Sequence, residues 1–136
     1  MLRCPSSSRC WAAATAPPAF DGGYQAAMRL FGRSSAPTAV LAANNLMTVG
    51  ALRALHDLGL RIPDVVSVVG FDDHSLADLL DPPLTVVGRA TATQGAVATR
   101  MLLARLSAAT SGEGRTVRLE TTLIVRSSTA TPRVAA

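Results

Sequence analysis

The 136-residue chain contains no lysine, few aromatic residues and only two cysteines. All 13 of its basic residues are arginines, and they are scattered, so the formal net charge of +4 forms no phosphate-binding stripe. Cys4 and Cys10 are too few for a disulfide scaffold, and the nearest histidine, His56, is too far along the chain to complete a zinc site. No apolar run approaches the ~18 residues that a membrane-spanning helix needs. These absences favour a soluble, cytoplasmic protein without a membrane contact.

What the chain does have is a high apolar content. Hydrophobic residues make up 49% and charged residues 16% of the sequence, which suits one packed domain. Residues 1–19 carry a serine run and two adjacent prolines without a helical or strand period, so we expect a disordered leader there. The domain itself is expected over residues 20–129, with the chain fraying from Ser127 into a tail at residues 130–136.

Apolar periodicity predicts alternating strands and helices. A continuous apolar run at residues 38–43 predicts a strand buried on both faces, and a second run at residues 65–70 predicts another. The helix between them, residues 45–58, ends before Gly59, which suits a left-handed cap. Strand, helix and strand in this order form a βαβ unit, which implies parallel strands and a right-handed crossover. The expected fold class is therefore α/β, a parallel sheet flanked by helices.

Further elements surround this unit, and the sequence shows no internal repeat. We expect a helix capped by Asp21 and ended by Gly32, a helical turn from Leu76 to Leu80, a strand at residues 84–87, a helix at residues 91–108 and a half-exposed strand at residues 117–125. The helix at residues 91–108 carries an apolar stripe made of Gly95, Ala98, Leu102, Leu106 and Ala109.

Two polar residues, Asn44 and Asp72, follow directly after the predicted strands. In a parallel α/β sheet, ligands bind outside the carboxyl ends of the strands. If the two strands are neighbours, about 4.8 Å apart, both side chains share one rim and offer an amide and a carboxylate to a polyhydroxylated ligand. Each residue has an alternative role as a cap. Asn44 can cap the helix at residues 45–58, and Asp72 can cap the helical turn from Leu76 to Leu80.

Asp72, Asp73 and His74 form a cluster that suggests a metal, and a metal-dependent hydrolase is one interpretation of it. Adjacent residues on a strand point to opposite faces, so consecutive ligands converge poorly and we expect no metal site. The sequence also contains no nucleophile elbow, phosphate loop or dinucleotide-binding glycine motif. We therefore expect a binding protein rather than an enzyme, with no cofactor.

The helix at residues 45–58 has two apolar faces. At about 100° per residue, one face should cover the sheet. The other face groups Leu46, Val49 and Leu52 near the polar residues Arg53 and His56. A second apolar patch of this kind suggests a subunit contact, and the alternative is that a neighbouring loop covers it.

Several linked motifs closely resemble the LacI/GalR family of bacterial transcriptional regulators. They are residues 22–27 (GGYQAA), 37–55 (PTAVLAANNLMTVGALRAL), 59–63 (GLRIP), 66–73 (VSVVGFDD) and 81–85 (DPPLT). The match covers roughly residues 20–129, and the motifs keep the family's spacing. A set of linked motifs is far more specific than any single short pattern.

The resemblance implies an incomplete sensor subdomain of the periplasmic-binding-protein fold (type I), from the carboxy-terminal part of the effector-binding domain. It implies that Asn44 and Asp72 contact a small effector of the sugar or nucleobase class. Arg89 and Thr91 would face this ligand where the chain crosses between subdomains. The resemblance also implies a homodimer through the helix at residues 45–58 and the segment 74–81, with contacts from Leu46, Val49, Leu52, Arg53, His56, Leu76, Leu79 and Leu80.

The chain departs from the family pattern at several points. Asn44 and Asn45 stand where the family usually has Asn-Asp, residues 63–66 (PDVV) replace Pro-Glu-Asp-Val, and Thr91 replaces a frequent aromatic. Neither a helix-turn-helix nor most of the first subdomain is visible, so we expect a truncated regulator that does not bind operator DNA by itself. The alternative is a fragment of a periplasmic-type sugar-binding transport protein, although a good signal sequence is lacking.

Overall fold

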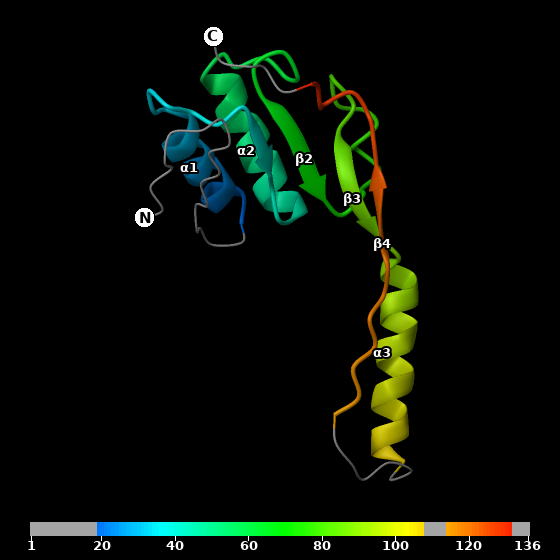
Figure 1. Cartoon of the computed structure of the whole chain (residues 1–136). Coiled ribbons are helices and arrows are strands. Elements are labelled where there is room, and N and C mark those ends of the chain that lie inside the picture. The colour runs from blue at the N-terminus through cyan, green and yellow to red at the C-terminus, as the bar shows by residue number, and fades with distance from the viewer. Residues whose placement is uncertain (1–18, 108–113, 132–136) are drawn as a thin grey trace.

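The computed structural model describes residues 19–107 and 114–131 of the chain (Figure 1). The elements in chain order are α1 (Phe20–Phe31), β1 (Ala39–Leu41), α2 (Asn45–Asp57), β2 (Ser67–Phe71), β3 (Thr85–Arg89), α3 (Thr91–Leu106) and β4 (Thr121–Ile124). Helices α1 and α2 lie together beside the sheet, whereas α3 leads away from it. No helix among the described residues is long and apolar enough to cross a membrane.

The four strands form one sheet in the order β1-β2-β3-β4. The first three strands are parallel, as the βαβ pattern predicts, with Leu41 opposite Val69 and Phe71 opposite Val87. The expected α/β fold class is confirmed, and the sheet departs from parallel pairing at one edge, where β4 pairs antiparallel with β3. After α3 the chain returns toward β3 through residues 114–120, so β4 runs back along β3 and the sheet is mixed.

The helix boundaries follow the sequence signals with one correction. Gly59 adopts a left-handed conformation (φ 67°) directly after the α2 cap residue Leu58, which confirms the predicted end of the helix. Asp21, by contrast, is not the cap of α1. The helix begins at Phe20, two residues earlier than a cap at Asp21 implies, Ala19 occupies the cap position without a side-chain hydrogen bond, and Asp21 lies in the first turn. A carboxylate there still interacts favourably with the helix dipole.

Helices α1 and α2 cross at very short range because two glycines lie at the contact. A Cβ atom at Gly50 would stand 2.2 Å from the carbonyl oxygen of Phe20, and one at Gly23 would stand 2.3 Å from that of Met47. No side chain fits at such distances. The glycines therefore weaken the intrinsic helix propensity but permit a contact between backbones.

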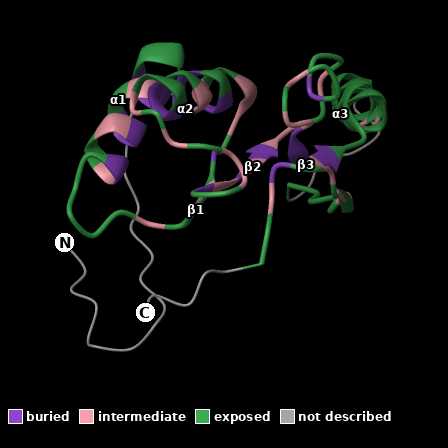
Figure 2. Ribbon diagram, turned by 90° about the horizontal axis from the view of Figure 1, so that it is seen from above, coloured by how far each residue is buried: buried purple, intermediate pink, exposed green. Residues whose placement is uncertain are grey.

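The core lies between the two helices and one face of the sheet (Figure 2). Buried side chains from α1, α2, β2, β3 and the turn before β3 form a single cluster, which includes Phe31, Leu55, Val68, Ala77, Leu84 and Val86. Strand β1 was expected to be buried on both faces, and this expectation is wrong: Leu41 is 62% exposed. The described helices cover only one face of the sheet, so alternate residues of β1 face solvent.

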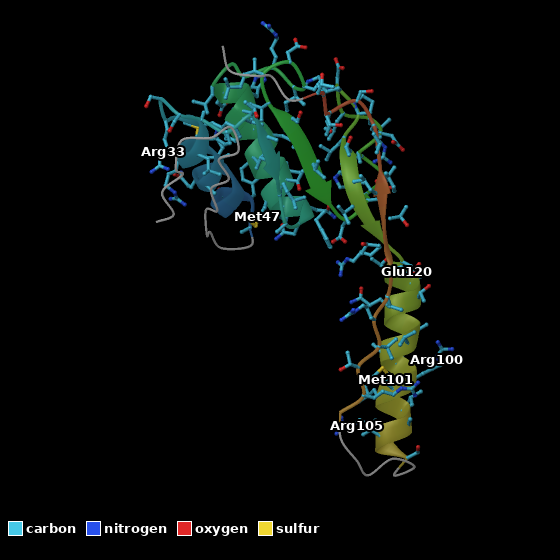
Figure 3. All side chains as sticks on the ribbon, in the orientation of Figure 1. Arg33, Met47, Arg100, Met101, Arg105 and Glu120 are labelled. Carbon is cyan, nitrogen blue, oxygen red and sulfur yellow. The ribbon has the colours of Figure 1, made fainter. Side chains whose placement is uncertain are left out.

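Helix α3 has no buried residue. The side chains of Leu102 and Leu106 from the predicted apolar stripe are exposed, as is that of the adjacent Leu103, whereas Ala109 lies outside the described residues. Figure 3 shows the side chains of Arg100, Met101 and Arg105 along this helix, away from the sheet. The apolar pattern is present, but no second layer lies against it in the described part of the chain.

The segment after β4 is anchored rather than frayed. Ser128 is 1% exposed, and its hydroxyl donates to the carbonyl oxygen of Val68 at 2.6 Å and accepts from the amide of Thr85 at 2.8 Å. Arg126 donates to the carbonyl oxygen of Leu84 at 2.8 Å and pairs with Asp73 at 3.1 Å. The prediction that the chain frays from Ser127 is therefore wrong, because these polar side chains form hydrogen bonds with backbone groups of the sheet and its flanks.

Candidate functional site

Asn44 and Asp72 stand at one rim of the sheet. Strands β1 and β2 are parallel neighbours, and Leu41 lies opposite Val69. Asn44 and Asp72 each follow that pair by three residues, at the carboxyl ends of the strands. The fold thus provides the shared rim that the proposed sensor requires.

Asn44 is the N-cap of α2. Its side-chain oxygen Oδ1 accepts a hydrogen bond from the amide of Met47 at 2.9 Å, and its backbone carbonyl accepts from the Thr48 hydroxyl at 2.7 Å. The alternative capping role is therefore confirmed. Within the described part of the chain, the amide nitrogen Nδ2 has no hydrogen-bond partner, so this donor is free for a ligand.

Asp72 and Arg89 form a bidentate ion pair across the rim. Nη2 of Arg89 donates to Oδ2 of Asp72 at 2.8 Å, and Nε donates to Oδ1. The guanidinium also lies over the ring of Phe71, 5.6 Å from its centroid, and Nη1 donates to Oε1 of Gln94 at 3.2 Å. Four groups from β2, β3 and α3 therefore converge at this point.

The charges at the rim shift each other's protonation equilibria. Hydrogen bonding from Arg89 lowers the pKa of Asp72, with partial desolvation opposing the shift. The same hydrogen bond raises the pKa of Arg89. Both groups therefore stay ionised over the whole neutral range, and the pair is neutral as a unit.

Asp72 has an unusual backbone conformation, with φ at +72°. This left-handed region is uncommon outside glycine, although aspartate and asparagine tolerate it. The backbone amide of Asp72 donates to the carbonyl oxygen of Val87 at 2.9 Å, so the hydrogen bonding between β2 and β3 extends to this residue. Asp72 was considered as a cap for the following turn, but its carboxylate instead faces Arg89.

Two residues that the sequence did not single out as ligand contacts lie at the rim beside Arg89 and Asp72. Thr91 is the exposed first residue of α3, two positions after Arg89. The additional residues are Gln94, one turn into α3, and Asn45, whose amide faces the end of β2. The departure from Asn-Asp to Asn-Asn was the only sequence signal for Asn45, and nothing marked Gln94.

Asp72, Asp73 and His74 do not converge on a common point. Asp72 pairs with Arg89, Asp73 pairs with Arg126, and Nδ1 of His74 accepts from the amide of Leu76 at 3.2 Å. No group of three metal-ligating side chains occurs within residues 19–107 and 114–131. Each of the three side chains thus meets a different partner, and all three residues follow β2 rather than lying within it.

The residues expected at a dimer interface divide into two groups. Leu46 and Val49 on α2 and Leu76 and Leu79 on the turn before β3 are 44–78% exposed. The remaining four have partners or neighbours within the chain. Leu52 and Leu80 lie against the core, and Arg53 pairs with Asp57 at 2.9 Å. His56 lines a hollow of about 550 Å³ near the amino ends of β2 and β3.

Comparisons with known proteins agree with this architecture. Residues 6–129 match the family described as periplasmic binding protein-like domain, a range that begins inside the expected leader. The chain is 43% identical over 110 residues to the HTH-type transcriptional regulator MalR of Streptomyces coelicolor, and 40% identical over 109 residues to the regulator CelR of Thermobifida fusca. These matches cover 81% and 80% of this chain but 31% and 32% of the relatives.

Solved structures show the same relationship. A complex of the transcriptional regulator CelR with cellobiose superposes with a TM-score of 0.73 at 40% identity, and covers 81% of this chain and 33% of that one. A LacI family transcriptional regulator from Enterococcus faecium with bound ribose gives a TM-score of 0.69 at 28% identity, and covers 82% and 41%.

The fold and the matches define the class: the chain belongs to the family of periplasmic binding protein-like domains. Its relatives are transcriptional regulators of the LacI type, and the chain corresponds to part of their effector-binding domain. It spans about a third of the length of the curated relatives it matches. None of the relatives named above is described as an enzyme.

Proposed function

We propose that the chain is the effector-sensing and dimerisation portion of a LacI-type transcriptional regulator, located in the cytoplasm. The observation that carries the proposal is the convergence of an amide, a carboxylate and a guanidinium at the carboxyl ends of neighbouring strands. Asn44, Asp72, Arg89 and Thr91 are the proposed ligand contacts.

The charge state of the rim favours a neutral, polyhydroxylated effector. Arg89 is already neutralised by Asp72, so an anionic ligand would have to compete with an internal carboxylate. Hydroxyl groups of a sugar, by contrast, donate to the remaining lone pairs of Asp72 and accept from Nδ2 of Asn44. The structure of the relative CelR contains cellobiose and that of another regulator contains ribose, which supports the sugar class.

The expected affinity of the described chain is low. High affinity needs a pocket that buries 70–90% of the ligand, whereas Arg89 and Thr91 are exposed and α3 leads away from the rim. We therefore expect millimolar dissociation constants, on the order of −4 kcal/mol of binding free energy.

The test is an NMR titration of the chain with cellobiose and with ribose. Shifts should concentrate on Asn44 and Asp72, and Asp72→Asn should weaken binding roughly tenfold or more, because a hydrogen bond to a charged group contributes about 1.5–3 kcal/mol. Asp64→Asn, which changes an exposed carboxylate elsewhere, is the control. No saturable shift at the rim with any sugar would contradict the proposal.

Asn44→Asp separates the ligand role of Asn44 from its capping role. Aspartate keeps the acceptor that caps α2 but lacks the amide donor, so stability should change little while sugar binding weakens. Asn44→Ala, by comparison, should lower the free energy of unfolding by about 1 kcal/mol. Unchanged sugar binding by Asn44→Asp would remove Asn44 from the site.

The dimer is proposed to use the exposed apolar residues of α2 and of the turn before β3. Sedimentation equilibrium should show a monomer–dimer exchange that Val49→Asp weakens by tenfold or more, because the substitution places a charge in an apolar contact. Gln25→Asp adds the same charge at an exposed residue of α1 and should leave the exchange unchanged. Equal effects of both substitutions would exclude a specific contact through α2.

The proposal assigns no DNA contact to this chain, because its sequence contains no recognisable recognition helix. A gel-shift assay with the purified chain and the DNA upstream of its gene should show no retarded band. Saturable binding to one operator would refute this assignment.

A further inference from the structure

The first residue of α2 reaches across to the end of β2. With its amide nitrogen oriented toward acceptors, Asn45 donates to the carbonyl oxygen of Phe71 at 3.1 Å and to that of Asp72 at 3.0 Å. Successive carbonyl groups of an extended strand point in opposite directions. One amide group can therefore reach both only where the backbone turns between them.

That turn occurs at Asp72, the residue with φ at +72°. Its backbone is held on two sides, since its amide donates to Val87 on β3 and its carbonyl accepts from Asn45 on α2. Its side chain then meets Arg89 in a bidentate pair. The left-handed conformation and the direction of the carboxylate thus belong to one arrangement.

We propose that Asn45 is a positioning residue of the effector site, which holds Asp72 in the left-handed conformation that directs its carboxylate to Arg89. The inference rests on the proposed function of the rim. Asn45 does not cap α2, because Asn44 already does so. By linking the start of α2 to the end of β2, Asn45 also fixes Asn44 relative to Asp72.

In this chain, the donor to both carbonyl oxygens is the amide of Asn45. An aspartate of the same size cannot donate to either carbonyl when ionised, and it places a negative charge beside two partial negative charges. An alanine removes the donor without adding charge. Both substitutions leave two carbonyl oxygens at the strand end without their side-chain partner.

The first experiment follows the Asp72 carboxyl through a pH titration by carbon-13 NMR in the full chain. In Asn45→Ala, Asp72 should leave Arg89, and its pKa should rise toward the ordinary value of a free aspartate. Asn45→Asp should raise the pKa of Asp72 further, because it adds a negative charge. The neutral variant Asn45→Ala therefore tests the positioning role without this added charge. If Asn45→Ala fails to fold, the same titration is measured in Asn45→Ser.

The matched control is Thr48→Val, which removes the hydrogen bond to the Asn44 carbonyl in the first turn of the same helix but keeps the methyl group that lies beside Gly70 of β2. If Asn45 has a merely structural role, Asn45→Ala should lower the stability, as Thr48→Val does, and should leave the titration of Asp72 unchanged. An unchanged Asp72 titration in folded Asn45→Ala therefore overturns the proposal.

The second experiment measures cellobiose binding by the same variants. If cellobiose binds the unaltered chain, Asn45→Ala should weaken binding by fivefold or more while Thr48→Val should not. If Asp72 titrates as expected but no sugar binds the unaltered chain, the proposed effector site is wrong. The proposal that Asn45 positions Asp72 is then still supported. If the sugar binds equally to the chain and to Asn45→Ala, the positioning role is wrong.

Discussion

The ion pair between Asp72 and Arg89 joins the ends of two neighbouring strands at the candidate site. The partners reach each other because Asp72 leaves β2 in a left-handed turn while Arg89 is the last residue of β3. Because Arg89 is partly exposed, solvent screens the pair, and it contributes little to global stability. Its main effect is to fix the direction and charge of the two groups.

Substitution of Arg89 tests this description at the scale of the residue. Arg89→Ala should raise the pKa of Asp72 toward its ordinary value, since the hydrogen bonds that favour the ionised form are lost. In the unaltered chain, the contribution of the pair is present above the unfolded-state pKa of Asp72 and is lost as the pH falls through the lower folded-state pKa. Urea unfolding as a function of pH should therefore show that Arg89→Ala flattens the acid-side loss of stability.

The control for this prediction is Arg61→Ala. Arg61 pairs with Asp64 on the surface at 3.1 Å, away from the rim, so its removal should not affect the titration of Asp72. If Asp72 keeps its lowered pKa in Arg89→Ala, a different group is responsible for the shift.

At the scale of the element, the crossing of α1 and α2 leaves no room for a side chain at Gly50. Gly50→Ala places a Cβ atom against the carbonyl oxygen of Phe20, where the backbone has to move. We expect it to lower the free energy of unfolding by about 3 kcal/mol. Urea denaturation followed by circular dichroism measures this change.

Gly95→Ala in α3 is the matched comparison. A Cβ atom at Gly95 meets nothing within 4 Å, so this substitution should raise the helix propensity of α3 by roughly 0.5–1 kcal/mol without a steric penalty. Similar effects of the two alanines would mean that the crossing is not as close as the geometry indicates.

At the scale of the whole molecule, two apolar surfaces of the described residues remain uncovered besides the proposed dimer contact. One is the sheet face opposite the helices, where Leu41, Leu123 and Val125 are 58–68% exposed, and the other is α3 with Leu102 and Leu106. A sheet that is mainly parallel is normally covered on both faces. The described chain is therefore expected to associate or to bind apolar probes.

Binding of the dye ANS tests this expectation. The folded chain should increase ANS fluorescence, and the double substitution Leu102→Gln and Leu106→Gln should reduce it with little change in stability, because both side chains are exposed. A monomer with a sharp melting transition that is independent of protein concentration would contradict the expected association.

Local patterns in the sequence determined much of this protein. Apolar periodicity located α2, β2 and the strand order of the βαβ unit, and the glycine at position 59 located a helix end, because each depends on neighbouring residues only. The placement of Asn44 and Asp72 at one rim followed from the same pattern, since parallel strands bring their carboxyl ends to one edge.

Only the tertiary structure decided which groups these residues meet. The pairing of Asp72 with Arg89, the reach of Asn45 to β2, the burial of Ser128 and the antiparallel β4 all join residues far apart in the sequence. The exposure of β1 and α3 likewise depends on which layers are present rather than on the apolar pattern itself. Long-range contacts of this kind carry no local signal, because the partner of a polar or apolar side chain is set by the packing of whole elements.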